Sequence, residues 1–158
     1  MKKSRTELIS QYKPLAYLRL AASYNEAALV LCRELGSEGF RAPQRFLFEH
    51  AVELYLKSYL LVKGFDEGEL KNNSGHDIKK LMHECNAKGL DFTDKDIAVI
   101  GILRGNSERS ICLYPVTGHY QTIELSDILE TCKSLLEKIA PLLGPSGQIV
   151  LRKFKGDK

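Results

Sequence analysis

The stretch KNNSGHDIKKLMHE contains the residue types best able to do chemistry: a His-Asp pair, His76 and Asp77, with His83 seven positions further on. Imidazole and carboxylate groups at such spacing can bind a divalent metal or move protons. The same residue types also begin helices, because a carboxylate accepts hydrogen bonds from free backbone N–H groups. The elements that surround the pair must decide between these roles.

Turn-forming residues precede the pair, and apolar residues at helical spacing follow it at Ile78, Leu81 and Cys85. Asp77 therefore falls at the N-cap or in the first turn of a helix, where its charge also favours the positive end of the helix dipole. We predict that Asp77 begins a helix. His83, further along the same helix, is expected to be a partly exposed surface or interface residue rather than a ligand.

A metal-binding alternative uses the same pair. His50, His76 with Asp77, and Asp127 follow the order of a metal-dependent phosphohydrolase of the His-Asp type, in which a bound divalent metal activates water. Only the order of the residues matches. In the phosphohydrolase pattern an apolar helix precedes the His-Asp pair, whereas here an Asn-Asn-Ser-Gly turn precedes it. We therefore expect no metal and no cofactor.

Apolar periodicity along the chain predicts helices, each closed by glycine, proline or a polar loop. They cover residues 14–35, residues 44–63 and about residues 126–143. Between the last two of these, a short helix follows the His-Asp pair and stops near Gly89, and another begins after Thr93 or Asp94 and runs through Leu103, with its end left open. The expected fold is thus an all-α, up-down bundle of about five helices in a single domain over residues 1–158.

Two segments depart from this helical pattern. Residues 110–124 place β-branched and aromatic residues around a Thr-Gly turn, which predicts a short β-hairpin or an extended segment. Residues 144–158 form a basic tail, for which a short strand and a flexible, frayed end are both open. Basic residues at both chain ends would assist RNA binding if they are ordered.

The composition excludes several classes of protein. The 158 residues carry a formal net charge of +3, which permits an acidic partner without requiring one. No apolar run approaches the roughly 18 residues of a membrane span or the core of an export signal. The four cysteines stand singly, so they predict neither a zinc site nor a redox pair. We expect a protein of the reducing cytoplasm that does not enter a membrane.

Two segments, one of them part of the His-Asp stretch, carry a family resemblance. EHAVELYLKSYLLVKGF followed by GHDIKKLM resembles the HEPN domain (higher eukaryotes and prokaryotes nucleotide-binding), and a Tyr-Pro pair at Tyr114 and Pro115 agrees with it. The resemblance extends more loosely over residues 17–143. The matching residues are Glu53, Leu56, Lys57, Gly64, Gly75, His76, Asp77, Ile78 and Leu81.

The resemblance implies a helical bundle that dimerises through its long helices and acts in toxin-antitoxin pairs, phage defence or RNA processing. Active members are metal-independent RNases with an arginine, four to six intervening residues and a histidine. In this chain Arg104 is followed by Arg109, and no histidine occurs before His119. The one match in spacing, Arg45 to His50, lies in the second helix and not where the family keeps its site.

The best polar cluster for phosphate is therefore Arg104, Asn106 and Arg109, since two guanidinium groups suit phosphate and Gly105 allows close backbone approach. A solvated helix end is the alternative role for this cluster. Lys57 is expected to lay its stem along the core and to reach an acidic neighbour or a helix end.

These observations predict a catalytically degenerate HEPN-like module, with no catalytic residue assigned. We expect a homodimer that binds RNA, a nucleotide or an antitoxin-type protein. Lys57, Gly75, His76 and Asp77 are the motif residues of structural or binding importance. The open alternatives are a metal-independent endoribonuclease with a non-standard site, the metal phosphohydrolase, and a bare interaction bundle.

Overall fold

The computed structural model describes residues 5–35, 42–103 and 123–156. Throughout these residues the regular structure is helical and there is no strand, which confirms the all-α class. Besides the helices expected from the sequence, the described ranges contain a short α3 and a C-terminal α8. The expected number of about five helices is therefore not confirmed.

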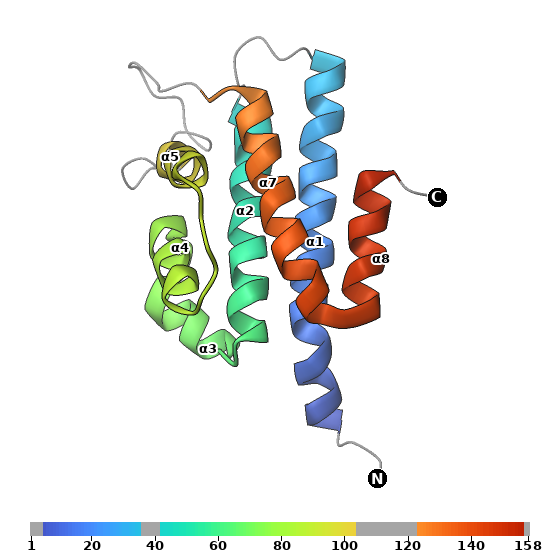
Figure 1. Cartoon of the computed structure of the whole chain (residues 1–158), viewed down its shortest axis with the longest axis vertical. Coiled ribbons are helices and arrows are strands. Elements are labelled where there is room, and N and C mark those ends of the chain that lie inside the picture. The colour runs from blue at the N-terminus through green and yellow to red at the C-terminus, as the bar shows by residue number, and fades with distance from the viewer. Residues whose placement is uncertain (1–4, 36–41, 104–122, 157–158) are drawn as a thin grey trace.

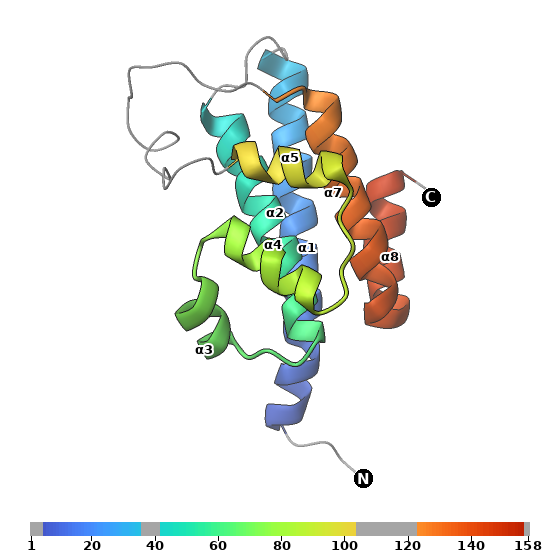
Figure 2. The same cartoon turned by 60° about the vertical axis from the view of Figure 1, so that its left-hand side comes forward.

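The centre of the fold is a pair of long antiparallel helices, α1 (Arg5–Leu35) and α2 (Ala42–Val62). Figure 1 shows α7 (Leu125–Ile139) running beside both of them. The α1 helix begins earlier than the expected start at Pro14, and its first turns project beyond the bundle (Figures 1 and 2). A proline inside a helix removes one backbone bond and crowds the carbonyl four residues earlier, yet α1 is helical on both sides of Pro14.

The core lies where α1, α2 and α7 meet, and it extends to α4 and α5. The α7 helix contributes a stripe of buried side chains at three- and four-residue spacing, which is the helical period of its apolar residues. The largest fully buried apolar side chains are Leu18, Phe48, Leu56, Leu60, Ile78, Leu81, Ile100, Leu103, Ile128, Leu135 and Leu136. Tyr55, also fully buried, carries a hydroxyl whose pKa is raised by burial.

The segment that follows α2 is more ordered than the polar loop expected there. Asp66 caps the three-residue α3 (Glu67–Glu69), because its carboxylate accepts from Glu69 N while the Glu69 carboxylate accepts from Asp66 N. A π-helical turn, η1 (Leu70–Ser74), follows and buries Leu70. This capping box and one anchored leucine explain why a polar sequence forms helical turns here.

Two shorter helices pack against the outer side of α2. The α4 helix (Ile78–Ala87) begins after Asp77, and α5 (Asp94–Leu103) lies across the long axis of the bundle (Figure 2). Tyr59 of α2 connects α2 to the end of α4, since its hydroxyl donates a hydrogen bond of 2.8 Å to the carbonyl of Lys88.

Residues 144–155 of the C-terminal tail form a helix, so the short strand expected there was wrong. Pro145 lies in the first turn of α8 (Gly144–Lys155), a position where proline starts a helix rather than ending one. A 3-10 turn, η2 (Ala140–Leu143), joins it to α7, and Val150 of α8 is buried. Burial against α1 supplies the stability that an isolated basic helix lacks.

The expected hairpin near residues 110–124 falls almost wholly outside the described residues. Its last two positions, Ile123 and Glu124, directly precede α7. In the part of the chain that the structure describes, no helix is long and apolar enough to cross a membrane.

Candidate functional site

A stripe of charged residues runs along the otherwise apolar α2. Arg45, Glu49, Glu53 and Lys57 follow one another every four residues and therefore share one face of the helix. Both carboxylates are buried. Since a buried charge is costly unless it is paired, the partners of this stripe define its role.

Glu53 is the centre of the stripe. Its Oε1 atom lies 2.7 Å from Nζ of Lys57, one turn along α2, and 2.7 Å from Nδ1 of His76. The Glu53 side chain is 1% exposed, whereas that of His76 is 51% exposed. With its proton on Nδ1, His76 donates to the carboxylate, so the cluster links the interior of α2 to the surface turn before α4.

Each motif residue in this turn has a distinct structural task. Gly75 adopts a φ of +54°, which favours glycine, and thereby turns the chain from η1 towards α4. His76 reaches back to Glu53. Asp77 caps α4 by accepting from Lys80 N at 3.1 Å, which confirms the predicted helix start. The acidic neighbour predicted for Lys57 is likewise confirmed as Glu53.

A second histidine approaches the same carboxylate. His50 Nδ1 lies 4.0 Å from Oε2 of Glu53, and the His50 ring packs edge-on against Tyr24 with centroids 4.5 Å apart. Burial raises the pKa of Tyr17 on α1, and the negative charges of Glu67 and Glu53 raise it further. The Glu53 carboxylate thus has imidazoles, an ammonium and a phenol in its surroundings.

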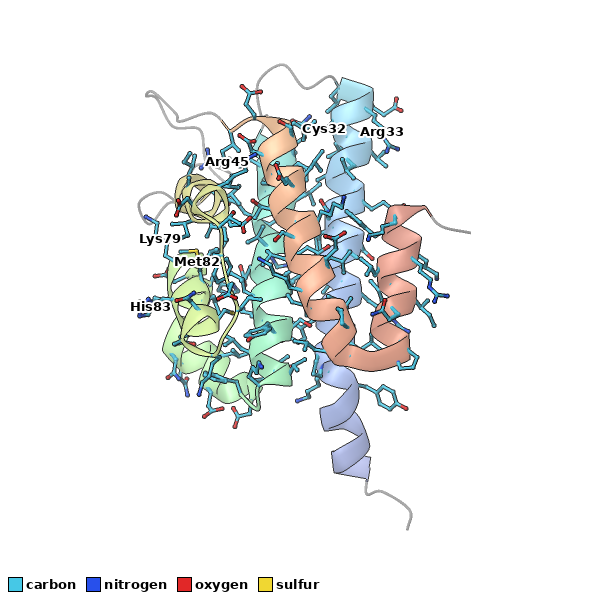
Figure 3. All side chains as sticks on the ribbon, viewed as in Figure 1. Cys32, Arg33, Arg45, Lys79, Met82 and His83 are labelled. Carbon is cyan, nitrogen blue, oxygen red and sulfur yellow. The ribbon has the colours of Figure 1, made fainter. Side chains whose placement is uncertain are left out.

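Arg45 lies at the other end of the stripe. Its Nε donates to Glu49 at 3.0 Å, and its Nη2 donates to the carbonyls of Ile102 and Leu103 at 2.6 and 3.0 Å. Figure 3 shows Arg45 between α2 and α5. These bonds satisfy carbonyls at the last described turn of α5, and the cation favours the negative end of that helix. Arg45 therefore has a structural role, which is to hold the end of α5 against α2.

The predicted phosphate cluster, Arg104, Asn106 and Arg109, lies outside the described residues. It follows directly in sequence the helix end that Arg45 holds. That prediction therefore stays a prediction.

The two carboxylates of the phosphohydrolase alternative have separate partners. Asp77 caps α4, and Asp127 on α7 pairs with Lys95 at 3.3 Å. Among the residues that the structure describes, no three His, Cys, Asp or Glu side chains are grouped to hold a metal ion. His83 is exposed, as predicted, and Figure 3 shows it on the outer side of α4.

The sequence reading missed the roles of Glu49, Glu53 and Arg45. The available signal was the regular four-residue spacing of charges inside an apolar helix. Comparison of the chain with protein-family models, with curated proteins and with solved structures finds no match.

Proposed function

We propose that this protein is a catalytically degenerate HEPN-like module that binds the phosphates of RNA or of a nucleotide. One observation carries the family part of the proposal. The two segments of the resemblance, one on α2 and one at the start of α4, are joined in space by the 2.7 Å contact between Glu53 and His76.

This contact also supports a structural role for the motif. Lys57 and His76 are the motif residues able to hold a ligand or move a proton, and both are bound to the buried Glu53 carboxylate. Groups engaged in this way maintain the packing of α4 on α2. The motif is then an architectural element, and the ligand is bound elsewhere.

Phosphate binding is assigned to Arg104, Asn106 and Arg109. Two guanidinium groups and an amide can hold phosphate oxygens, but no imidazole follows Arg104 before His119. A missing general acid or base removes a factor of roughly 10² to 10⁴ in rate, so cleavage should be slow or absent. Arg45 supports the assignment because it immobilises the end of α5 directly before this segment.

The wider setting belongs to the same proposal. The protein would act in the cytoplasm as a homodimer, in a toxin-antitoxin or defence context with an antitoxin-type partner. Tyr12 and Leu20 on α1 are exposed apolar side chains that a second copy would cover.

The test is the binding of a fluorescent single-stranded RNA to the full chain, followed by anisotropy between about 50 and 200 mM salt. Arg104→Ala with Arg109→Ala should lower the affinity and reduce the salt slope by about 1.4, since each phosphate contact on a single strand contributes about 0.7. Lys79→Ala with Lys80→Ala, at two exposed lysines of α4, is the matched control. Circular dichroism should report an intact fold in both.

Two results would contradict the proposal. Unchanged affinity in the arginine double variant would place the ligand elsewhere. Efficient RNA cleavage in the presence of a chelator, abolished by the same substitutions, would establish the metal-independent endoribonuclease instead.

A further inference from the structure

A groove of about 570 Å³ lies between α1 and α8, on residues that the proposed phosphate site does not use. The two helices approach each other along the flank shown on the right of Figure 1. Apolar side chains and charges line the groove together. Its lining residues are Arg19, Ala22, Ser23, Glu26, Leu29, Val30, Arg33, Ile149, Val150, Lys153 and Phe154.

The lining residues of α1 recur at intervals of three and four positions, from Arg19 to Arg33. This is the heptad spacing on which a second helix packs. At 1.5 Å per residue the stripe is about 21 Å long, or roughly four helical turns. A stripe of that length and period suits a helix better than a small molecule.

The groove exposes apolar surface from both of its walls. Val30 of α1 is 47% exposed and Ile149 of α8 is 50% exposed. Phe154, one turn and a residue beyond Ile149, is half-buried. Covering these side chains would remove apolar area from water, which is the main favourable term in helix docking.

The charges on α1 alternate in sign along the stripe. Arg19, Glu26 and Arg33 are each seven residues apart, and Lys153 adds a further cation from α8. Figure 3 shows Arg33 pointing outward on the side of α1 where α8 lies. Within the described ranges, no ion pair involves any of these four residues.

This order of charges favours a helix of a different protein over a second copy of this chain as the occupant of the groove. The positive-negative-positive pattern reads the same in both directions, so a second copy laid over the whole stripe would oppose like charges in either orientation. A copy shifted by one heptad avoids this, but it leaves part of the stripe uncovered. A helix with negative, positive and negative charges at the same spacing would match the stripe over its full length.

We infer that the groove binds an amphipathic helix of a partner protein. That helix carries an apolar stripe with acidic, basic and acidic residues at heptad intervals. The acidic residues face Arg19 and Arg33, the basic residue faces Glu26, and the apolar residues cover Val30 and Ile149.

The probes are fluorescein-labelled helical peptides of about 21 residues, three heptads each. One carries Glu, Lys and Glu at the facing positions, a second carries Lys, Glu and Lys, and a third is a scramble of the first. Anisotropy with the full chain should show that the first binds at least about tenfold more tightly than the other two. Added salt should narrow this difference.

Variants of the chain separate the contributions. Val30→Ser with Ile149→Ser should weaken binding of the first peptide about tenfold, whereas Ile97→Ser, at an equally exposed apolar residue of α5, should leave it unchanged. Exchange of the three α1 charges, Arg19→Glu, Glu26→Lys and Arg33→Glu, should transfer the preference to the second peptide. Misfolding cannot produce such an exchange of preference.

Several outcomes would overturn the inference. Equal binding of the first two peptides, or no binding of the first at high micromolar concentration, would remove the charge argument. Binding that survives Val30→Ser with Ile149→Ser would place the peptide elsewhere. If the first peptide does not bind and the chain sediments as a dimer that Ile149→Ser dissociates, a second copy occupies the groove.

Discussion

Nδ1 of His76 lies 2.7 Å from Oε1 of Glu53, although the two residues are 23 positions apart in the chain. The same carboxylate oxygen lies 2.7 Å from Nζ of Lys57. One buried acceptor therefore holds a cation of its own helix and the histidine that precedes α4. The contact determines how the two segments of the family resemblance are joined.

Glu53→Gln should lower the free energy of unfolding by about 3 kcal/mol, because it leaves the largely buried Lys57 ammonium without an opposing charge. Urea denaturation followed by circular dichroism measures the change. Glu130→Gln removes an exposed partner of Lys95 and is the control, for which we expect little change. Equal effects of the two substitutions would show that the Glu53 cluster is not a structural element.

Asp77→Ala should lower the free energy of unfolding by about 1 kcal/mol, since it removes the acceptor for Lys80 N. Asp77→Asn should retain most of the stability, because an amide oxygen can accept the same bond. The two variants are compared by thermal and urea unfolding, with and without a chelator. A metal site at His76 and Asp77 would instead make the wild-type protein sensitive to the chelator and both variants insensitive.

Gly147→Ala should destabilise the protein by about 1 to 3 kcal/mol, because a Cβ at this position of α8 would collide with the carbonyl oxygen of Ala140 and with Leu143. Gly101→Ala is the matched helical control. Its Cβ would meet no atom among the described residues within 4 Å, so the substitution should stabilise α5 by about 0.5 to 1 kcal/mol. In urea denaturation, the free energy of unfolding should fall for Gly147→Ala and rise for Gly101→Ala. Two stabilising changes would contradict the packing of α8 on η2.

The sequence by itself determined the all-α class, most helix positions and the start of α4. These features depend on interactions between residues a few positions apart. The apolar period of α7 and the capping of α4 by Asp77 are of this kind. For Lys57 the sequence left an acidic neighbour and a helix end open, and the structure shows the acidic neighbour, Glu53, one helical turn away.

Only the tertiary structure decided which groups meet across the chain. The Glu53 and His76 pair, the bonds from Arg45 to the end of α5, and the groove between α1 and α8 each join residues more than twenty positions apart. Local sequence also misjudged the basic tail, because a marginal helix such as α8 is stabilised by burial of Val150 against other helices. Long-range packing is a property of the folded chain, and no short window of sequence contains it.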